Sequence, residues 1–471
     1  MSLWDSLLTL STAQMIAFLI ALIVAFGFEF INGFHDTANA VTTVIYTRSM
    51  KATPAVVYSG IMNFVGVLVG GTTVAFSIVN LLPVDLLVDA RSNTALVMVL
   101  SLLVAGVIWN LGTWYLGLPV SSSHTLIGSI LGVGIANGIC EEHGLDGLNT
   151  KEVVKVFLAL LFSPLMGFIF SAMLLLLMRF LIRQPRLYTP PVDGDRPPSW
   201  IRVVLIGTCG GVSFAHGSND GQKGMGLILL VLIGFIPIHY ALDTESPEKA
   251  EAVLEASADV RTAYAKADQE MPPDLKRQLD FIELKLAGKK SFDQLVETDE
   301  ERQAKKSDIP LRWEIRTAIF KADQLMADPK LPAELKSDLA KPRKVFAGSI
   351  EFVPLWVKIC TALALGIGTM IGYKRIVITV AEKIGKTHLT YAQGAAAETV
   401  AATTILLAAL SGIPVSTTQV LSSGIAGTMV ANRSGVQGAT ARKILMAWLF
   451  TLPCTMLLSG SLFVIGRLIV G

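Results

Sequence analysis

The chain has 471 residues, of which 52% are hydrophobic and 16% charged, and its mean hydropathy is +0.57. A soluble protein of this length would carry about 25% charged residues, so the composition excludes an ordinary soluble domain. The formal net charge of +2 gives no indication of nucleic-acid binding, and we expect none.

Ten apolar runs separated by polar breaks predict membrane-spanning helices, which need about 20 apolar residues each. They lie near residues 13–45, 55–82, 93–116, 118–138, 153–181, 201–238, 353–373, 390–410, 413–431 and 443–468. The first and sixth runs exceed a simple crossing and carry polar residues in the middle, so we expect broken or tilted helices there. The first run has no basic segment before it and no clear cleavage site, which favours a retained helix over a signal peptide.

Charge is concentrated in residues 243–351, which hold 23 of the 37 acidic and 19 of the 39 basic residues. This segment is rich in helix formers, and we interpret it as a soluble helical insertion. The other basic residues gather in loops near 48–51, 179–202, 374–386 and 433–443. The positive-inside rule places these loops in the cytoplasm, and both termini and the insertion outside the cell membrane.

An internal repeat divides the chain. The first copy contains GFHDTANA at 33–40 and GLPVSSSHT at 117–125, and the second contains GSNDGQKG at 217–224 and GIPVSTTQV at 412–420. Five spans per copy is an odd number, so the second copy must cross the membrane in the opposite direction, as in many transporters. The predicted organisation is a first membrane repeat (1–181), a basic cytoplasmic linker (182–200), the first span of the second repeat (201–242), the insertion (243–351) and the rest of the second repeat (352–471).

Several ionisable residues lie inside the apolar runs, where each charge costs about 2.5–3.5 kcal/mol on insertion scales. They are Glu29, His35, Asp36, His216, Asp220, Lys223 and Glu398. One explanation is that such residues have no role beyond holding helices together. The equivalent places of Asp36 and Asp220 in the two copies favour a functional interpretation, with substrate and ions bound where the copies meet.

The acidic motifs suit a cation. Asp36 and Asn39, three residues apart, put a carboxylate and an amide oxygen on one helix face, and Gly33 allows the backbone to break and expose carbonyl groups. Oxygen ligands of this kind suit sodium, a proton or a divalent metal. In the second copy Lys223 stands at the place of Asn39, where its ammonium group either replaces a bound cation or pairs with Asp220.

The two Pro-Val-Ser segments suit an anion. Proline is typical of the first turn of a helix, where hydroxyl groups lie beside free backbone N–H groups. Two opposed half-helices would present a set of hydroxyls to one tetrahedral oxyanion: Ser121, Ser122, Ser123, Thr125, Ser416, Thr417 and Thr418. The alternative is that these residues only cap or pack helices. Two copies at matching positions favour binding.

These motifs resemble the Pit family of inorganic phosphate transporters, and most closely its bacterial low-affinity members. The resemblance covers roughly residues 25–180, 200–235 and 352–468, and it rests on NGFHDTANA at 32–40, FAHGSNDGQKG at 214–224 and the Pro-Val-Ser segments. Asp36 and Asn39 match the family's Gly-Ala-Asn-Asp-Val-Ala-Asn signature, as do Asn219 and Asp220 in the second copy. His35 and Lys223 depart from the sodium-coupled pattern.

The resemblance implies phosphate import into a bacterial cell across the inner membrane by symport. Similar bacterial members are associated with proton coupling and with uptake of neutral metal-phosphate complexes, and the resemblance marks His216 and Glu398 as transport-relevant. We therefore expect phosphate, protons, a divalent metal and the lipid bilayer as partners. The metal would lie near Asp36 and Asp220. No tightly bound cofactor is expected, and the choice between monomer and homodimer stays open.

Four alternatives remain at this point. Sulfate is also a tetrahedral oxyanion, and sodium could replace the proton as coupling ion. A passive ion channel is disfavoured by the inverted repeats and the buried titratable groups. An intramembrane enzyme is disfavoured because the sequence has no His/Cys cluster with metal spacing, no HExxH motif and no phosphate-binding P-loop.

Overall fold

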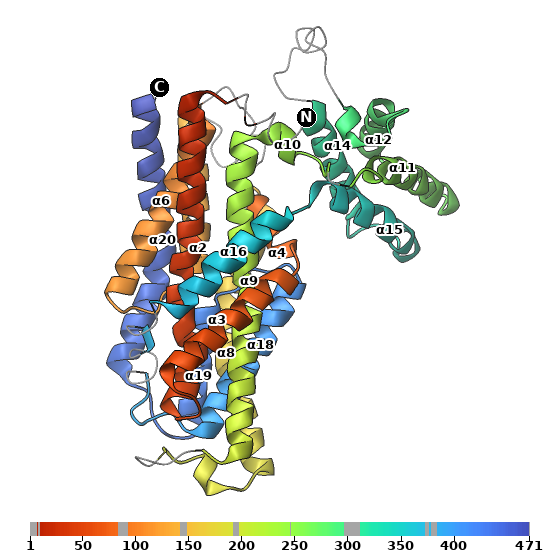
Figure 1. Ribbon diagram of the computed structural model, residues 1–471. Coiled ribbons are helices and arrows are strands. Elements are labelled where there is room, and N and C mark those ends of the chain that lie inside the picture. The colour runs from red at the N-terminus through yellow and green to blue at the C-terminus, as the bar shows by residue number, and fades with distance from the viewer. Residues whose placement is uncertain are drawn as a thin grey trace. The chain divides into compact units, whose positions relative to one another are not determined.

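The computed structural model describes residues 7, 10–82, 93–141, 148–191, 197–244, 246–295, 311–372, 376–377 and 384–470, without the side chains of 36–39, 93 and 237–238. This part of the chain is helical, with one isolated bridge between Gly385 and Val436, and it confirms the predicted all-helical class. The helices in chain order are α2 (Thr12–Tyr46), α3 (Ala52–Val69), α4 (Thr73–Val79), α6 (Asn93–Tyr115), α7 (Ser122–Cys140), α8 (Thr150–Leu181), η1 (Pro185–Leu187), α9 (Ser199–Phe235), α10 (Pro237–Tyr240), α11 (Lys249–Lys266), α12 (Pro273–Leu286), η2 (Phe292–Gln294), α14 (Leu311–Met326), α15 (Ala333–Ile350), α16 (Leu355–Met370), α18 (Tyr391–Leu410), α19 (Thr417–Ala431) and α20 (Gly438–Val470) (Figure 1).

A helix lies in each of the ten ranges that the apolar runs predict, but fewer of them qualify as membrane spans. Among the described helices, α2, α3, α6, α7, α8, α18 and α20 are long and apolar enough to cross a bilayer. The polar residues in the middle of α9 lower its hydropathy, while α16 and α19 have only 16 and 15 residues. Length and composition thus support seven spans among the described residues, or up to eight if one bent pair of helices counts as a span, and the number ten stays a prediction.

The described chain forms two compact units, of which one consists mainly of residues 232–353. In this unit α11 packs against α15 and α12 packs against α14 (Figure 1). Apolar side chains fill the space between these helices, among them Leu279, Ile319 and Phe346, each fully buried. Burying a Leu, Ile or Phe side chain contributes about 1.5–3 kcal/mol, so charged surface helices and an apolar interior coexist here as in a soluble domain.

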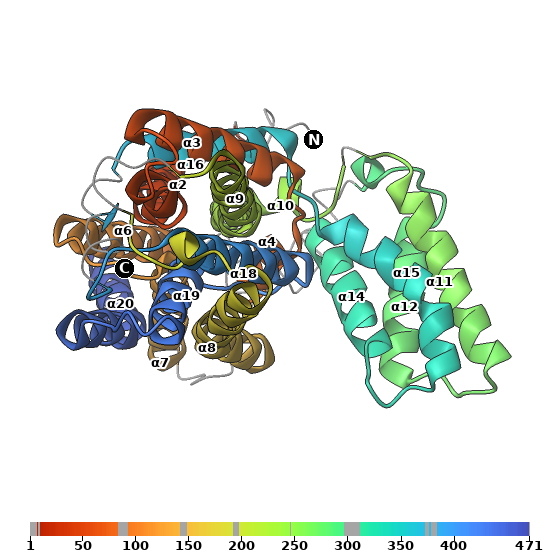
Figure 2. The same ribbon diagram turned by 90° about the horizontal axis from the view of Figure 1, so that it is seen from below.

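The second unit consists mainly of residues 19–86, 96–231 and 354–471. In it α3 packs beside α16, α7 beside α20, and α19 beside α8 and α18 (Figure 2). The helix after each Pro-Val-Ser segment thus packs on the last helix of the other predicted repeat. This exchange is what a two-fold relation between the repeats would produce. Their opposed direction in the membrane stays a prediction.

The long helices α2 and α9 are continuous, so of the two predicted alternatives, a broken or a tilted helix, the break is not observed. Gly33 does not interrupt α2. A Cβ atom there would lie 2.6 Å from the backbone nitrogen of Thr369 on α16, so glycine is required for close helix packing. Gly217 has a similar role in α9, where a Cβ atom would lie 2.2 Å from the Asn63 carbonyl oxygen. Small residues at such contacts are typical of helices that pack within a membrane.

Candidate functional site

The N-termini of α7 and α19 meet at the centre of the second unit. Ser121 caps α7, where its Oγ accepts a hydrogen bond from the His124 amide at 3.1 Å, and Ser416 caps α19 by accepting one from the Gln419 amide at 3.3 Å. The Ser123 hydroxyl donates to the Val415 carbonyl oxygen at 3.0 Å and joins the two segments. Two helix N-termini, each with unsatisfied N–H groups and a partial positive charge, therefore lie side by side.

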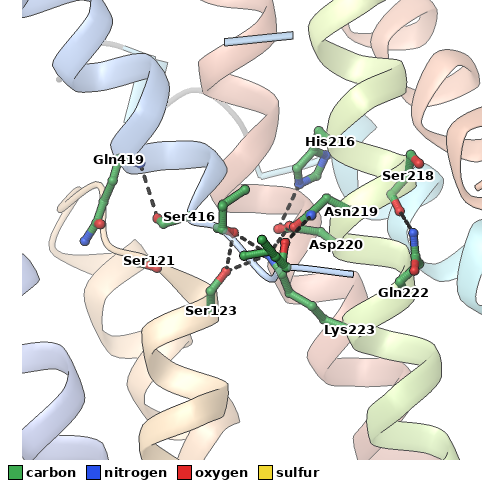
Figure 3. Close-up of polar contacts among 12 residues, drawn as sticks. Ser121, Ser123, His216, Ser218, Asn219, Asp220, Gln222, Lys223, Ser416 and Gln419 are labelled. Atoms are coloured by element: carbon green, nitrogen blue, oxygen red, sulfur yellow. Dashed lines mark hydrogen bonds and ion pairs between the residues drawn. The ribbon is translucent and has the colours of Figure 1, made fainter. Parts of the chain in front are cut away.

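The ammonium group of Lys223 on α9 lies at this junction (Figure 3). Its Nζ donates to Ser123 Oγ at 2.7 Å and to the Val415 carbonyl oxygen at 2.6 Å. It also forms an ion pair with Asp220 one turn earlier on the same helix. Of the two roles that the sequence leaves open for Lys223, the structure has the pair with Asp220.

A second set of polar contacts extends from Asp220 across α9. The Nε2 atom of His216 lies 3.2 Å from Asp220 Oδ2. The opposite ring atom, Nδ1, donates to Asn63 Oδ1 at 2.6 Å, and the Asn63 amide in turn donates to Thr369 Oγ1 at 3.1 Å. All of these side chains are buried. The network fixes the imidazole ring so that Nε2 faces the carboxylate.

This arrangement can bind an anion. A buried ammonium group lies beside two helix N-termini, which are favourable positions for phosphate or sulfate. The first Pro-Val-Ser segment contributes the Ser123 hydroxyl to this place and the second contributes the Val415 carbonyl oxygen. The paired carboxylate of Asp220 reduces the cost of burying the lysine. Titratable groups and anion ligands are therefore in direct contact.

The other predicted ligands take different positions. Asn219 donates to the Ile413 carbonyl oxygen at 3.4 Å, just before the second Pro-Val-Ser segment. The Thr125 hydroxyl donates to the Ser121 carbonyl oxygen at 3.2 Å, within its own helix. Buried side chains also include Ser122, Thr417 and Thr418. In this structure Ser121 and Ser416 thus act as helix caps, the alternative role that their positions allow.

His35 and Glu398 make their contacts away from Lys223. The Nε2 atom of His35 lies 2.9 Å from the Asn110 carbonyl oxygen on α6. The Glu398 carboxylate accepts a hydrogen bond from the Thr43 hydroxyl and another, 2.5 Å long, from the Thr208 hydroxyl. Glu398 therefore connects α18 with α2 and α9.

The side chains of Asp36 and Asn39 lie outside the described residues, so their part in the site stays a prediction. Helix α2 itself continues through both positions. Within the described ranges no three His, Cys, Asp or Glu side chains form a metal-binding group. The expected metal at Asp36 and Asp220 accordingly remains a prediction.

Two contact residues, Asn63 and Gln222, are missing from the sequence-based site. Asn63 orients His216 although 153 residues separate them. Gln222 joins α9 to α4 by accepting a hydrogen bond from the Val74 amide at 2.8 Å (Figure 3 shows Gln222 beside Ser218). Glu29 is noticeable in the sequence as an intramembrane acid but has no counterpart in the second repeat, where Ser213 occupies the equivalent place.

Comparisons with known proteins match nearly the whole chain. A family model described as "Phosphate transporter family" matches residues 32–459. The low-affinity inorganic phosphate transporter PitA of Escherichia coli K12 is 41% identical over 94% of this chain and 95% of its own length. The probable low-affinity inorganic phosphate transporter of Bacillus subtilis is 28% identical over 96% of this chain and 97% of its own length. A solved structure titled "The sodium-dependent phosphate transporter" shares the fold, with a TM-score of 0.62 and 18% identity over 97% of this chain and all of that one.

Proposed function

The chain belongs to the phosphate transporter family, and on this premise we propose that it is a secondary active symporter that imports inorganic phosphate together with protons. It is a multi-pass membrane protein. The observation that supports the proposal most directly is the ammonium group of Lys223 between Ser123 and Val415, beside the N-termini of α7 and α19. An oxyanion that replaces these contacts would gain a charge-assisted hydrogen bond, which is about twice as strong as a neutral one.

Proton coupling is supported by the same lysine. Lys223 holds the position in the second repeat that is equivalent to Asn39 in the first. Its fixed positive charge repels a sodium ion and replaces the bound sodium of the sodium-coupled pattern. Titratable groups line the site instead, since His216 and Asp220 are in contact. A proton gradient can act on such groups, whereas the ammonium group of Lys223 disfavours a sodium ion beside Asp220.

We further propose that the anion travels as a complex of hydrogen phosphate with a divalent metal. Such a complex is neutral, and moving a neutral species through a low-dielectric path avoids much of the desolvation cost of an ion. The metal is then part of the cargo, with Asp36 and Asp220 as its nearest carboxylates. On this proposal the protein is no enzyme, keeps no tightly bound cofactor and lies in the bacterial inner membrane with both termini and the insertion outside.

Uptake of labelled phosphate into proteoliposomes tests the proposal, with proton and sodium gradients imposed separately at a fixed membrane potential. We expect stimulation by an inward proton gradient, little effect of sodium, an increase with added divalent metal and weak competition by sulfate. Ser123→Ala should weaken phosphate binding about ten- to a hundred-fold, since a lost hydrogen bond to a charged group costs about 1.5–3 kcal/mol. Strong stimulation by sodium alone would contradict proton coupling, and preferred uptake of sulfate would contradict the substrate.

A further inference from the structure

Glu29 is the buried acid of α2 for which the proposed function so far has no role. Its side chain is fully buried in the middle of a candidate membrane span. Asn32, three residues on, is its polar neighbour on the helix, but neither carboxylate oxygen of Glu29 has a hydrogen bond of ordinary geometry from the described residues. An ionised carboxylate normally accepts several hydrogen bonds, and leaving one buried without them is costly.

The carboxyl group of Glu29 lies directly against α9 at the anion site. A Cβ atom built on Gly224 would come within 2.2 Å of Glu29 Cδ, so glycine at this position makes room for the acid. Gly224 is the residue after Lys223. The charges that act on Glu29 are those of Asp220, His216 and Lys223, all on α9. On α2 itself the ionisable neighbours along the chain are His35 and Asp36, whose side chain lies outside the described residues.

Among the described side chains of this cluster, the charges balance only with one additional proton. Lys223 and Asp220 form an ion pair and cancel. The carboxyl group of Glu29 then contributes one negative charge unless a proton binds either to it or to His216. Unpaired charge within a membrane costs about 2.5–3.5 kcal/mol even on the mildest scales. Binding or release of one proton therefore changes the net charge of these side chains.

Glu398 is the contrasting case. Its two oxygens accept hydrogen bonds from the hydroxyls of Thr43 and Thr208, and these contacts hold it between α2, α9 and α18. Neither carboxyl oxygen of Glu29 has a hydroxyl partner of this kind among the described residues. Of these two buried glutamates, Glu29 is the one that is not held by such contacts and that lies near the pair of Lys223 and Asp220.

We propose that Glu29 is the binding site of the coupled proton. The inference rests on the proposed proton symport and names the group that carries it out. In the outward-facing state a proton leaves hydronium and forms an O–H bond on the Glu29 carboxylate. The neutral acid faces Lys223 and the bound anion during the crossing. In the inward-facing state the O–H bond breaks, the proton passes to water and the carboxylate is restored.

The test compares Glu29→Gln with the unmutated protein in proteoliposomes. The amide is shaped like the protonated acid but cannot exchange a proton. We expect phosphate exchange between equal concentrations on both sides to persist, while stimulation of net uptake by an inward proton gradient is lost completely. Ser213→Ala is the matched control, because Ser213 holds the equivalent place in the second repeat and its hydroxyl contacts Ser59 at 2.8 Å. This variant should keep the full response to the gradient.

Infrared difference spectroscopy locates the proton independently. Phosphate binding to the unmutated protein should change a carboxylic-acid carbonyl band that is absent in Glu29→Gln. Glu29→Asp, which keeps a titratable group, should retain the response to the proton gradient. Loss of exchange in both variants would show that the side chain serves binding or folding and would overturn the assignment.

The outcomes separate the two proposals. If the unmutated protein shows no response to a proton gradient, the proposed symport itself is wrong. If it responds and Glu29→Gln responds equally, the symport stands and Glu29 is not the proton site. A carboxylic-acid band that persists in Glu29→Gln would likewise assign the proton to another group, with His216 and Asp220 the next residues to replace.

Discussion

The ion pair between Lys223 and Asp220 makes a prediction about stability that needs no transport measurement. Replacing Lys223 with Met leaves the Asp220 carboxylate buried with only the imidazole of His216 beside it, at 3.2 Å among the described residues. The change also removes the two hydrogen bonds from Nζ, at 2.7 Å to Ser123 Oγ and 2.6 Å to the Val415 carbonyl oxygen. The single variant should therefore lose much more stability than the double variant Lys223→Met with Asp220→Asn.

The expected size follows from the burial of both partners, whose side chains are 3% and 0% exposed. Breaking a buried pair by removing one member costs about 3–5 kcal/mol, whereas replacing both members by neutral residues of similar volume is often close to neutral. The coupling energy of the double-mutant cycle should accordingly reach about 3 kcal/mol or more.

Thermal unfolding of the four proteins in one detergent gives the order of stabilities. A second cycle on Lys155 and Glu152 provides the matched control. These residues are also three apart on a helix, but they are 44% and 27% exposed and 3.4 Å apart. Exposed pairs contribute about 0–1 kcal/mol, so this cycle should show almost no coupling. If the buried cycle were equally small, Lys223 and Asp220 would not form the pair described.

Two further variants test the packing of each unit. Gly132→Ala should destabilise the contact of α7 with α20 by about 1–3 kcal/mol, because the new Cβ atom would lie 2.1 Å from Ser459 Oγ. Gly112→Ala is the control, because its Cβ atom meets nothing within 4 Å, and it should not destabilise the protein. Equal unfolding temperatures of the two variants would contradict the packing of α7 on α20. In the insertion, burial lowers the pKa of Arg316 only to about 10, so the guanidinium stays charged at neutral pH and donates to two carbonyl oxygens. Arg316→Gln should cost about 1.5–3 kcal/mol and speed limited proteolysis of the insertion, whereas Arg261→Gln at the surface should change it little.

Much of the fold can be predicted from the sequence because lipid imposes a simple rule on each segment. Backbone groups in a bilayer must be satisfied within the segment, so every long apolar run forms a helix. The predicted ranges of α9 and α19 also form helices, but neither qualifies as a span by length and composition, because polar residues lower the hydropathy of α9 and α19 has only 15 residues. These helices belong to the site, since α9 carries Lys223 and Ser416 caps α19.

The contacts of the site are predictable only in part. Repetition of the Pro-Val-Ser segments indicates an anion site, and Lys223 attracts notice as a charge in an apolar run. No pattern connects Asn63 with His216, since pairing between side chains far apart in the chain depends on how α3 and α9 pack. Gly33 is ambiguous for a similar reason. A glycine allows either a break or a close contact, and only the position of α16 decides for the contact.

The two repeats differ in the charge that each brings to the site. Asp36 and Asp220 are equivalent, but seven positions before them the first repeat has Glu29 and the second has Ser213. Three positions after them the second repeat has Lys223, and the first has an uncharged asparagine. A single additional charge of either sign would be costly within a membrane. Because Gly224 lets Glu29 approach α9, the additional acid of one repeat lies against the helix that carries the additional base of the other. Exchange of a single proton changes the sum of their charges.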